Sequence, residues 1–457
     1  MSTKTLASFT SKITYEQLSD HSKMIAKKCI LDWLGVSIRG SQEIPAKILK
    51  ATILGEGDCP NGQATILAGS TQKTTTLQAA MFNGASSHTL DFDDLHNPSI
   101  IHLACVVIPG VLSLAEANHK NGKEMIAAVC AGYEAGARIG ESVIPESYFF
   151  WHTTGTAGTF GAAAAAANIL GLNEQETLMC YGSAGTQTAG LWEFLKEGAM
   201  SKALHVGKAC YAGVLSALLA KNGFTGASQI CEGEKGFCRA MVANPHLEKL
   251  TENLDINDLK IDHNSFKPYA CCKHSHASNY AVQTICKENS IKISDIKGIK
   301  LFVNNVTNFL INNPNPQNPY GCKFSIQYCV SACAKHGVVG IEQFSPEAIN
   351  DPEVRALMSN VEVIQDPEEE AIFQADASKL ASKVTIILKN GKEYTMQVDY
   401  PKGDPDNTLT WQETEEKFMH LATPVYGELK ARKLCTLIKN LETCTDFAKD
   451  LAMCLEN

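Results

Sequence analysis

Apolar residues recur every three to four positions through most of the first 262 residues, the spacing expected of helices buried on one face. The pattern starts in residues 15–55 with the run MIAKKCILDWLGVSI. It continues from Thr74, and it resumes on either side of a break at Lys120–Lys123. Later stretches such as GTFGAAAAAANILG and KACYAGVLSALLAKNG are dense in Ala and Gly, which let helices pack closely. The sequence therefore predicts one all-helical domain over residues 1–262.

The spacing of apolar residues changes near Asp262, where alternating apolar and polar residues replace the helical spacing. The stretches DIKGIKLFVNNV and NVEVIQD alternate as strands do. The stretch VTIILKNGKEYTMQVDY predicts a hairpin with a type I′ turn at Asn390-Gly391. Helical spacing returns at His276–Glu288 and Ser325–His336. The predicted fold is therefore mainly α, with a smaller α+β domain inserted over residues 263–403 and a helical return over residues 404–457.

Composition narrows the functional classes. The chain has 457 residues, which is long enough for two domains. Its formal net charge of -9 argues against nucleic acid as a partner, because nucleic acid needs a basic face. No apolar run reaches the length of a membrane span and the N-terminus lacks an apolar signal core, so we expect a cytoplasmic protein without a membrane partner. The 17 cysteines include no CxxC pair, which gives no support for a zinc ribbon or a thioredoxin-type site.

The most chemically distinctive stretch is HTLDFDDLHNPSIIHLACVVIP, which lies between two long helical patterns. Two neighbouring carboxylates push one pKa upward if both are buried. Imidazoles titrate near neutrality, which is the range that a general base needs. The stretch is therefore either a solvated loop with helix caps or one wall of a cleft that moves protons. Its candidate groups are Asp91, Asp93, Asp94, His88, His96 and His102.

Three later stretches carry side chains suited to binding or protonating a carboxylate substrate. In WHTTGTAG, His152 precedes a helix N-terminus, which favours anions. In MSKALHVGK, Lys202, His205 and Lys208 lie at i, i+3 and i+6, either as a grip for a carboxylate or as a solvent-facing first turn. In GCKFSIQYCVSACAKHG, Tyr328 is either a donor to a developing oxyanion or a tyrosine of the core.

The stretch FKPYACCKHSHASNYA falls at the predicted domain boundary, where ligand clefts often form. Cys271, Cys272 and His274 look like metal ligands, but adjacent cysteines seldom chelate one zinc together. His276 at the start of a helix, with Lys267 nearby, fits anion binding better. We therefore expect no metal in this stretch.

Taken together, these motifs resemble the MmgE/PrpD family. HTLDFDD with PGVLSLAE, WHTTGTAGTFGAA, SKALHVGKA, KPYACCKHSHA and KFSIQYCVSA follow the family's order between about residues 20 and 440. The resemblance implies a large helical domain made by both chain ends, with a smaller α/β lid inserted between them. It also implies a homodimer that needs no metal or organic cofactor, with the cleft between body and lid. Family members include 2-methylcitrate dehydratase, cis-aconitate decarboxylase and iminodisuccinate epimerase, whose common step is proton transfer at a carbon next to a carboxylate.

Matching the motifs residue by residue implies two sets of site residues. The chain also departs from the family pattern, with Leu95 where many relatives have threonine and His102-Leu103-Ala104 where His-Pro-Ser is usual. Substrate preference is expected to depend on this irregular run. The implied catalytic residues are Asp91, His102, His152 and Tyr328, the implied substrate-binding residues are Lys202, Lys267 and His276, and Lys208 and His96 complete the candidate substrate-binding set.

The main hypothesis is a cofactor-independent lyase, either a dehydratase or a decarboxylase, that acts on a small di- or tricarboxylate such as 2-methylcitrate or cis-aconitate. The first alternative is an epimerase or isomerase of a dicarboxylate in the same cleft, for which His102 and His152 would supply two opposed bases. A second alternative is a non-catalytic helical protein that binds carboxylates. A third is a zinc enzyme that uses Cys271, Cys272 and His274.

Overall fold

The computed structural model describes residues 2–54, 59, 61–376 and 378–456, and the chain forms two compact units. The helical unit comprises Met1–Thr89, Asp93–Asn264 and Thr410–Asn457, and the mixed unit comprises Leu90–Phe92 and Ser265–Leu409. The fold is mainly α with a small α+β region, which confirms the predicted fold class. The domain boundaries expected after residues 262 and 403 stay predictions, because compactness does not show that each part folds alone. The start of the turn-rich stretch GEGDCPNGQATILAG, residues 55–69, lies mostly outside the described residues.

Side-chain caps explain where several helices of the helical unit begin. Thr75 accepts a hydrogen bond from the Gln78 backbone at the start of α4, as the run of threonines at 74–76 leads one to expect. The predicted break at Lys120–Lys123 separates α5 from α6, and Asn121 forms a capping box with Glu124 there. The helices of this unit before its last segment are α1 (Ser2–Ser11), α2 (Asp20–Gly40), α3 (Ile44–Leu54), α4 (Thr76–Ser87), α5 (Leu103–Ala117), α6 (Gly122–Glu141), α7 (Ala157–Ile169), α8 (Glu174–Gly185), α9 (Ser201–Lys221) and α10 (Phe237–Met241), with a two-stranded ladder of β1 (Ala64–Thr65) and β2 (Lys73–Thr74).

Small residues let the central helices of the helical unit approach one another closely. The helix α7 packs against α6 and α9, and α9 also packs against α4. A Cβ atom added to Gly213 of α9 would lie 2.5 Å from Ala162 Cβ and 2.7 Å from Ala163 N of α7. Glycine is therefore required at this crossing, since any larger residue would force the two helices apart.

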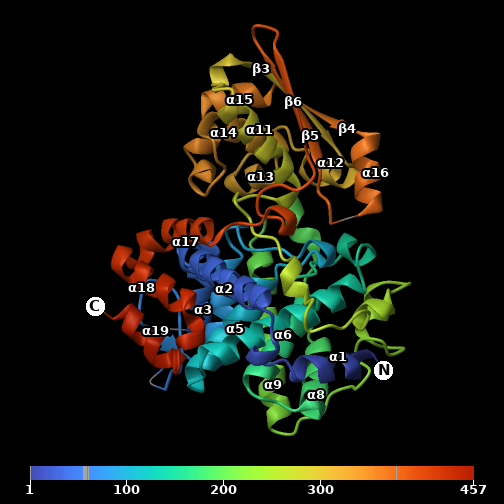
Figure 1. Ribbon diagram of the computed structural model, residues 1–457, viewed down its shortest axis with the longest axis vertical. Coiled ribbons are helices and arrows are strands. Elements are labelled where there is room, and N and C mark those ends of the chain that lie inside the picture. The colour runs from blue at the N-terminus through green and yellow to red at the C-terminus, as the bar shows by residue number, and fades with distance from the viewer. Residues whose placement is uncertain (1, 55–58, 60, 377, 457) are drawn as a thin grey trace. The chain divides into compact units, whose positions relative to one another are not determined.

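The last segment of the chain completes the helical unit. The helix α17 (Trp411–Tyr426) packs along α2, and α18 (Glu428–Lys439) and α19 (Phe447–Leu455) follow it (Figure 1). Lys417 of α17 pairs with Asp32 of α2 at 2.7 Å, and both side chains are buried. The first and last helical parts of the chain therefore share one core.

One helix of the described residues, α9, is long and apolar enough to cross a membrane. Of its most apolar window, 61% is buried inside the protein. Its glycine contacts with α7 and α4 place it in the core of the helical unit. A core helix of this composition passes the same length and hydropathy test as a membrane span.

The mixed unit contains a four-stranded sheet with the order β4-β3-β5-β6 (Figure 1). Strand β3 (Ile296–Val303) runs parallel to β4 (Val361–Gln365) and antiparallel to β5 (Ser382–Leu388), which pairs in turn with β6 (Glu393–Val398). Helix α11 packs against β5 and β6, and α14 packs against α11. The helices of this unit are α11 (His276–Glu288), α12 (Asn305–Ile311), α13 (Pro319–Lys323), α14 (Ile326–His336), α15 (Pro352–Met358) and α16 (Pro367–Ala375).

The hairpin between β5 and β6 forms where the sequence predicts it, but its predicted turn type is wrong. The Leu388 N–H donates to Lys392 O at 2.8 Å and the Gly391 N–H donates to Leu388 O at 2.9 Å, which encloses a three-residue loop. Gly391 has φ of 86°, whereas Asn390 is not in the left-handed region. A type I′ turn needs positive φ at both central residues, so this loop is a tight turn followed by a left-handed glycine.

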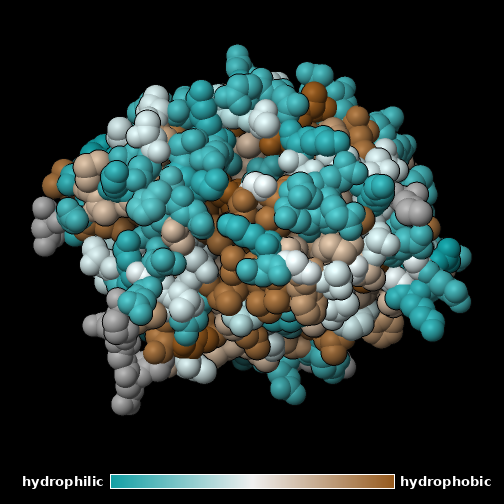
Figure 2. All heavy atoms as spheres, turned by 90° about the horizontal axis from the view of Figure 1, so that it is seen from below, coloured by the Kyte–Doolittle hydropathy of each residue, from teal (hydrophilic) through white to brown (hydrophobic). Residues whose placement is uncertain are grey.

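The surface mixes apolar and polar residues. Figure 2 shows hydrophobic residues gathered toward the middle of one face, with hydrophilic residues around them. Phe149 and Phe150 of the helical unit are 74% and 62% exposed. Apolar side chains are normal on protein surfaces, so exposure alone identifies no partner.

The crossing of α7 and α9 generates a stability prediction. Gly213→Ala is expected to lower the free energy of unfolding by about 1–3 kcal/mol, because the new methyl group overlaps the α7 backbone. Urea unfolding followed by circular dichroism measures the change. Gly321→Ala in α13 is the matched control, because its added Cβ would meet no atom closer than 3.5 Å. Equal losses in both variants would contradict the packing argument.

Candidate active site

An irregular segment between α4 and α5 carries the histidines of the distinctive stretch. Helix α4 ends at its C-cap residue His88, and α5 begins immediately after His102. Between them, the His96 N–H donates to Ile101 O at 2.9 Å and closes a short loop around a 3₁₀ turn at Asn97–Ser99. The segment therefore holds His88 and His102 at the ends of two packed helices.

Asp93 joins these two imidazoles. Its Oδ2 lies 2.6 Å from His88 Nδ1 and 3.3 Å from His102 Nδ1, and the two rings are 4.7 Å apart. Burial acts to raise the pKa of Asp93, but His88 and then His102 outweigh it and hold the pKa well below its usual range. Because an ionised carboxylate only accepts hydrogen bonds, His88 carries its hydrogen on Nδ1. Its Nε2 is then the acceptor atom of the ring.

Three buried polar atoms of this cluster have no hydrogen-bond partner among the residues that the structure describes. They are His88 Nε2, Asp93 Oδ1 and His102 Nδ1, the last of which lies 3.3 Å from Asp93 Oδ2 as an ion pair. An unpartnered buried polar atom costs free energy, so such atoms usually mark the place of a water molecule or a ligand. The cluster therefore has the character of a binding site rather than of a satisfied core.

His152, which precedes α7, belongs to the same cluster. Its ring stacks on His88 with centroids 5.4 Å apart and lies 4.8 Å from the ring of Trp192. Burial, and then the neighbouring His88 and Lys202, hold the pKa of His152 well below its usual range. Burial likewise lowers the pKa of His88 to about 4. Both imidazoles are neutral near pH 7 and can accept a proton.

Lys202 brings a positive charge to the cluster from the first turn of α9. Its side chain is buried, and its charge lowers the pKa of His88, His152 and His205. A buried ammonium group suits a carboxylate as its partner. Lys208 lies further along α9, where burial lowers its pKa, and its charge contributes to the lowered pKa of His205. The predicted roles of both lysines in substrate binding stay predictions.

Asp94 has a different part in the structure. Tyr133 Oη donates to its Oδ2 at 2.5 Å and Asn264 Nδ2 donates to the same oxygen at 2.8 Å. The Ala104 N–H donates to its Oδ1 at 3.0 Å. Burial raises the pKa of Asp94 to about 7. With both oxygens bound to protein donors, Asp94 anchors the start of α5.

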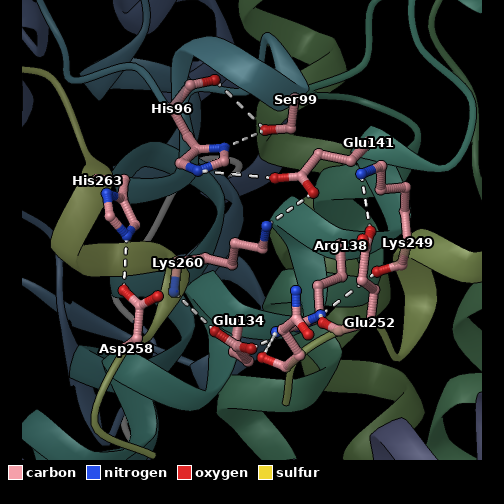
Figure 3. Close-up of polar contacts among 11 residues, drawn as sticks. His96, Ser99, Glu134, Arg138, Glu141, Lys249, Glu252, Asp258, Lys260 and His263 are labelled. Atoms are coloured by element: carbon pink, nitrogen blue, oxygen red, sulfur yellow. Dashed lines mark hydrogen bonds and ion pairs between the residues drawn. The ribbon is translucent and has the colours of Figure 1, made fainter. Parts of the chain in front are cut away.

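His96 lies in a second polar network, drawn in Figure 3. Its Nδ1 is 2.9 Å from Ser99 Oγ, and its Nε2 is 4.0 Å from Glu141 Oε1. Glu141 in turn pairs with Lys260 at 2.8 Å. Burial and then Lys260 hold the pKa of His96 well below its usual range. The structure therefore brings His96 to Glu141 of α6, and its predicted role in substrate binding stays a prediction.

The mixed unit brings together three other predicted site residues. Lys267 Nζ donates to Asp91 O at 3.1 Å and lies 3.4 Å from Asp91 Oδ2. His276 is buried at the start of α11, where burial, then Lys273 and Lys267, hold its pKa well below the usual range. Its Nδ1 has no hydrogen-bond partner among the described residues. This second cluster combines a carboxylate, an ammonium group and a neutral imidazole.

Tyr328 is buried in α14. Its hydroxyl group donates a hydrogen bond to Gln343 O, and its ring lies 5.7 Å from the ring of Phe344. Burial raises the pKa of this tyrosine. These contacts are those of a core tyrosine, and the catalytic role predicted for it stays a prediction.

Among the described residues, the donor atoms that lie close together form a poor binding site for a metal ion. The group of three whose donor atoms lie within 4.8 Å of one another is His88, Asp93 and Cys105, not the predicted alternative of Cys271, Cys272 and His274. Burial and then Asp93 hold the pKa of Cys105 well above its usual range, so it stays a thiol and donates to His102 O at 3.1 Å. A metal ligand would have to be the thiolate. This set of donors therefore fits a metal poorly.

Some residues of the cluster were not predicted as site residues. Asp93 and His88 were candidate groups of the distinctive stretch but not among the implied site residues, because their spacing of five gives no sign that they hydrogen-bond to each other. Trp192 and His205 reach His152 from later parts of the chain. The motif around Lys202 includes His205, whereas nothing in the sequence places the Trp192 ring beside an imidazole.

Comparison with known proteins identifies the family. The MmgE/PrpD N-terminal domain matches residues 4–250, and the MmgE/PrpD C-terminal domain matches residues 269–443. The chain belongs to the MmgE/PrpD family. The resemblance inferred from the motifs is thus confirmed.

This MmgE/PrpD chain is similar over nearly its whole length to characterised relatives. It is 27% identical to cis-aconitate decarboxylase of Homo sapiens, over 94% of the chain and 89% of the relative. It is 26% identical to cis-aconitate decarboxylase of Mus musculus, over 97% and 91%. It is also 26% identical to cis-aconitate decarboxylase of Aspergillus terreus, over 93% and 89%.

The buried neutral imidazoles generate a prediction for stability against pH. The folded-state pKa of His88 is about 4 instead of 6.5, and that of His152 is lowered as well. Below pH 6.5 the unfolded chain therefore binds protons that the folded chain does not. The stability due to these groups is complete above pH 6.5 and is lost as the pH falls toward about 4.

Urea unfolding at several pH values across this window measures the loss. His152→Gln is expected to lose stability less steeply on acidification than the unsubstituted protein. His119→Gln is the matched control, since the side chain of His119 is 67% exposed. An unchanged slope in His152→Gln would show that His152 does not contribute to the acid sensitivity.

Proposed function

We propose that this protein is a lyase that acts on a small tricarboxylate, with cis-aconitate as the first substrate to test. The observation that carries the proposal is the buried cluster in which an ionised Asp93 orients His88 beside His102 and His152, with Lys202 close by. Neutral imidazoles can move protons, and a buried ammonium group can hold a carboxylate. The cluster thus offers both functions that chemistry next to a carboxylate requires.

The similarity to the relatives supports decarboxylation as the reaction. Several relatives that match nearly the whole chain are named cis-aconitate decarboxylases. Their identities of 26–27% are too low to transfer a substrate by themselves. Dehydration of a related acid stays within the proposed class, since it also moves a proton at a carbon beside a carboxylate.

The proposed roles follow from charge and geometry. In a decarboxylation the bond to one carboxyl carbon breaks, CO2 leaves, and the electron pair stays on the remaining carbon skeleton. Lys202 would bind a carboxylate that stays on the molecule, and His152 or His102 would give the proton that ends on carbon. Asp93 would hold the neighbouring imidazoles in the productive tautomer, as carboxylates commonly do for catalytic histidines.

The proposal assigns a role in substrate binding to the predicted site residues of the mixed unit. In the mixed unit, Asp91, Lys267 and His276 are proposed to bind a carboxylate. The homodimer implied by the family resemblance is kept as a proposal, because exposed apolar side chains such as Phe149 and Phe150 allow a partner but do not identify one.

A substitution series tests the proposed roles. His152→Asn is expected to lower kcat by about 10²–10⁴-fold, the range that general acid–base groups contribute. Lys202→Met is expected mainly to raise KM, because it removes the cation for a carboxylate. Proton NMR in deuterated water follows substrate and product directly. Lys221→Met, at the exposed end of the same helix, is the matched control.

The same NMR experiment separates the alternatives. Loss of a carboxyl group or of water identifies a lyase. Solvent deuterium that enters recovered substrate without a new product would indicate an epimerase instead. Unchanged kinetics in both His152→Asn and Lys202→Met would contradict the proposed site.

We further propose that the reaction requires no metal ion. The support is that the donor atoms of this set already have other partners, because Asp93 Oδ2 binds His88 Nδ1 and Cys105 Sγ donates to His102 O. Elemental analysis of the purified protein is expected to find less than stoichiometric zinc or iron, and dialysis against a chelator is expected to leave kcat unchanged. Activity that is lost on chelation and restored by one metal would overturn this proposal.

A further inference from the structure

His205 lies beside His152 and reaches toward the surface. The two Nδ1 atoms are 3.4 Å apart, and the ring centroids are 5.6 Å apart. His152 is only 2% exposed, whereas His205 is partly exposed. The pair therefore leads from the buried histidine cluster to the solvent within the helical unit.

The backbone at Gly190 and Gly155 packs closely against the side chain of His205. A Cβ added to Gly190 would lie 3.1 Å from His205 Nδ1, and one added to Gly155 would lie 3.0 Å from His205 Cβ. The His152 N–H donates to Gly190 O at 2.9 Å, so the segment that contacts one imidazole also positions the other. The ring of Phe194 lies edge-on to His205, with centroids 5.6 Å apart. The position of the His205 ring is thus fixed on several sides.

Two nitrogen atoms at this distance can share one hydrogen. In the neutral pair, only one Nδ1 carries a hydrogen and the other accepts it. If His205 donates, then the hydrogen of His152 is on Nε2, and the opposite tautomer follows if His205 accepts. His205 therefore influences whether His152 carries its hydrogen on Nδ1 or on Nε2. The charged groups near His205 are Lys202 and Lys208 of its own helix, and His152 faces it from the segment before α7.

The proposed decarboxylation creates a need for such a pair. When a carboxylate leaves as CO2, a C–H bond replaces the C–C bond, so each turnover takes up one proton. Every side chain of the cluster formed by His88, Asp93 and His152 is buried. A buried acid that gives its proton to carbon must be recharged from solvent before the next turnover.

We propose that His205 is a proton relay that recharges His152 from solvent. This inference rests on the proposed function. A proton enters at His205 Nε2 from water or buffer, and the hydrogen on His205 Nδ1 passes to His152 Nδ1. His152 then releases its Nε2 hydrogen to the substrate carbon. One proton enters and one reaches carbon, no electrons are exchanged, and the rings regain their starting tautomers by exchange with water.

A comparison of single and multiple turnovers tests the relay. In His205→Ala, steady-state turnover of cis-aconitate at low buffer concentration is expected to fall about tenfold or more, toward the roughly 10²–10⁴-fold that groups in direct proton transfer to substrate contribute. The rate of the first turnover, measured with enzyme in excess after equilibration at a pH low enough to protonate His152, is expected to stay within about twofold, because the proton for that turnover is already bound. Added imidazole is expected to restore much of the steady-state rate.

Two control variants distinguish a role of His205 as a proton relay from a purely structural role. His205→Gln keeps a hydrogen-bonding group of similar reach but cannot carry a proton through a ring, so it is expected to share the defect and the rescue. His119→Ala, on the exposed surface, is expected to show neither. A first turnover that slows as much as steady state, without rescue by imidazole, would assign His205 a structural role and overturn the relay.

A second measurement does not depend on the substrate. Nitrogen-15 NMR of the histidine rings reports how fast the ring hydrogen of His152 exchanges with water, and this exchange is expected to slow in His205→Ala. An unchanged exchange rate would overturn the relay even if the protein decarboxylates cis-aconitate. If the unsubstituted protein does not convert cis-aconitate while the exchange slows in the variant, the proposed substrate fails and the relay stands.

Discussion

The buried carboxylate of Asp93 is the interaction on which the candidate active site depends. It is held ionised by His88 and His102, and it determines in turn which nitrogen of His88 carries the hydrogen. The stacking of His152 on His88 then extends this order to a third imidazole. Removing the charge of Asp93 would leave the tautomers of these rings undetermined. The arrangement of the cluster therefore depends on a carboxylate that the matching of family motifs did not include among the implied site residues.

The candidate site also depends on the burial of its side chains, and this burial lowers the stability of the folded protein. The pKa values of His88 and His152 are lowered, and both rings are neutral, because their surroundings solvate a charge poorly. The same surroundings leave His88 Nε2 and Asp93 Oδ1 without a hydrogen-bond partner among the described residues. A protein tolerates such groups only where the rest of the core compensates, and the closely packed helices α4, α5, α7 and α9 surround this region. The reactivity of the site and the density of the helical core are therefore linked.

The sequence predicted the local elements well and the contacts between distant residues poorly. Helical spacing placed the start of α4 near Thr74 and the break between α5 and α6 at Lys120–Lys123, because these signals act within a few residues. The turn at Asn390-Gly391 was placed correctly but given the wrong type, since one residue of loop length decides it. The meeting of Trp192 and His205 with His152 depends on how helices cross, which no local pattern records. Tyr328 shows the reverse case, because a motif marked it as catalytic while its hydroxyl group bonds to a backbone carbonyl.

Helix α9 contributes both to the packing of the core and to the candidate site. Gly213 fixes its position against α7, and Lys202 and His205 lie on its first turns. At a rise of about 1.5 Å per residue, Gly213 stands roughly 16 Å from Lys202 along the axis. An α-helix is stiff over this length, so a shift of α9 caused by a methyl group at the distant crossing would carry the ammonium group and the imidazole with it. Distance from the candidate site is therefore a poor guide to which substitutions disturb it, because the alignment of α9 positions both of these side chains.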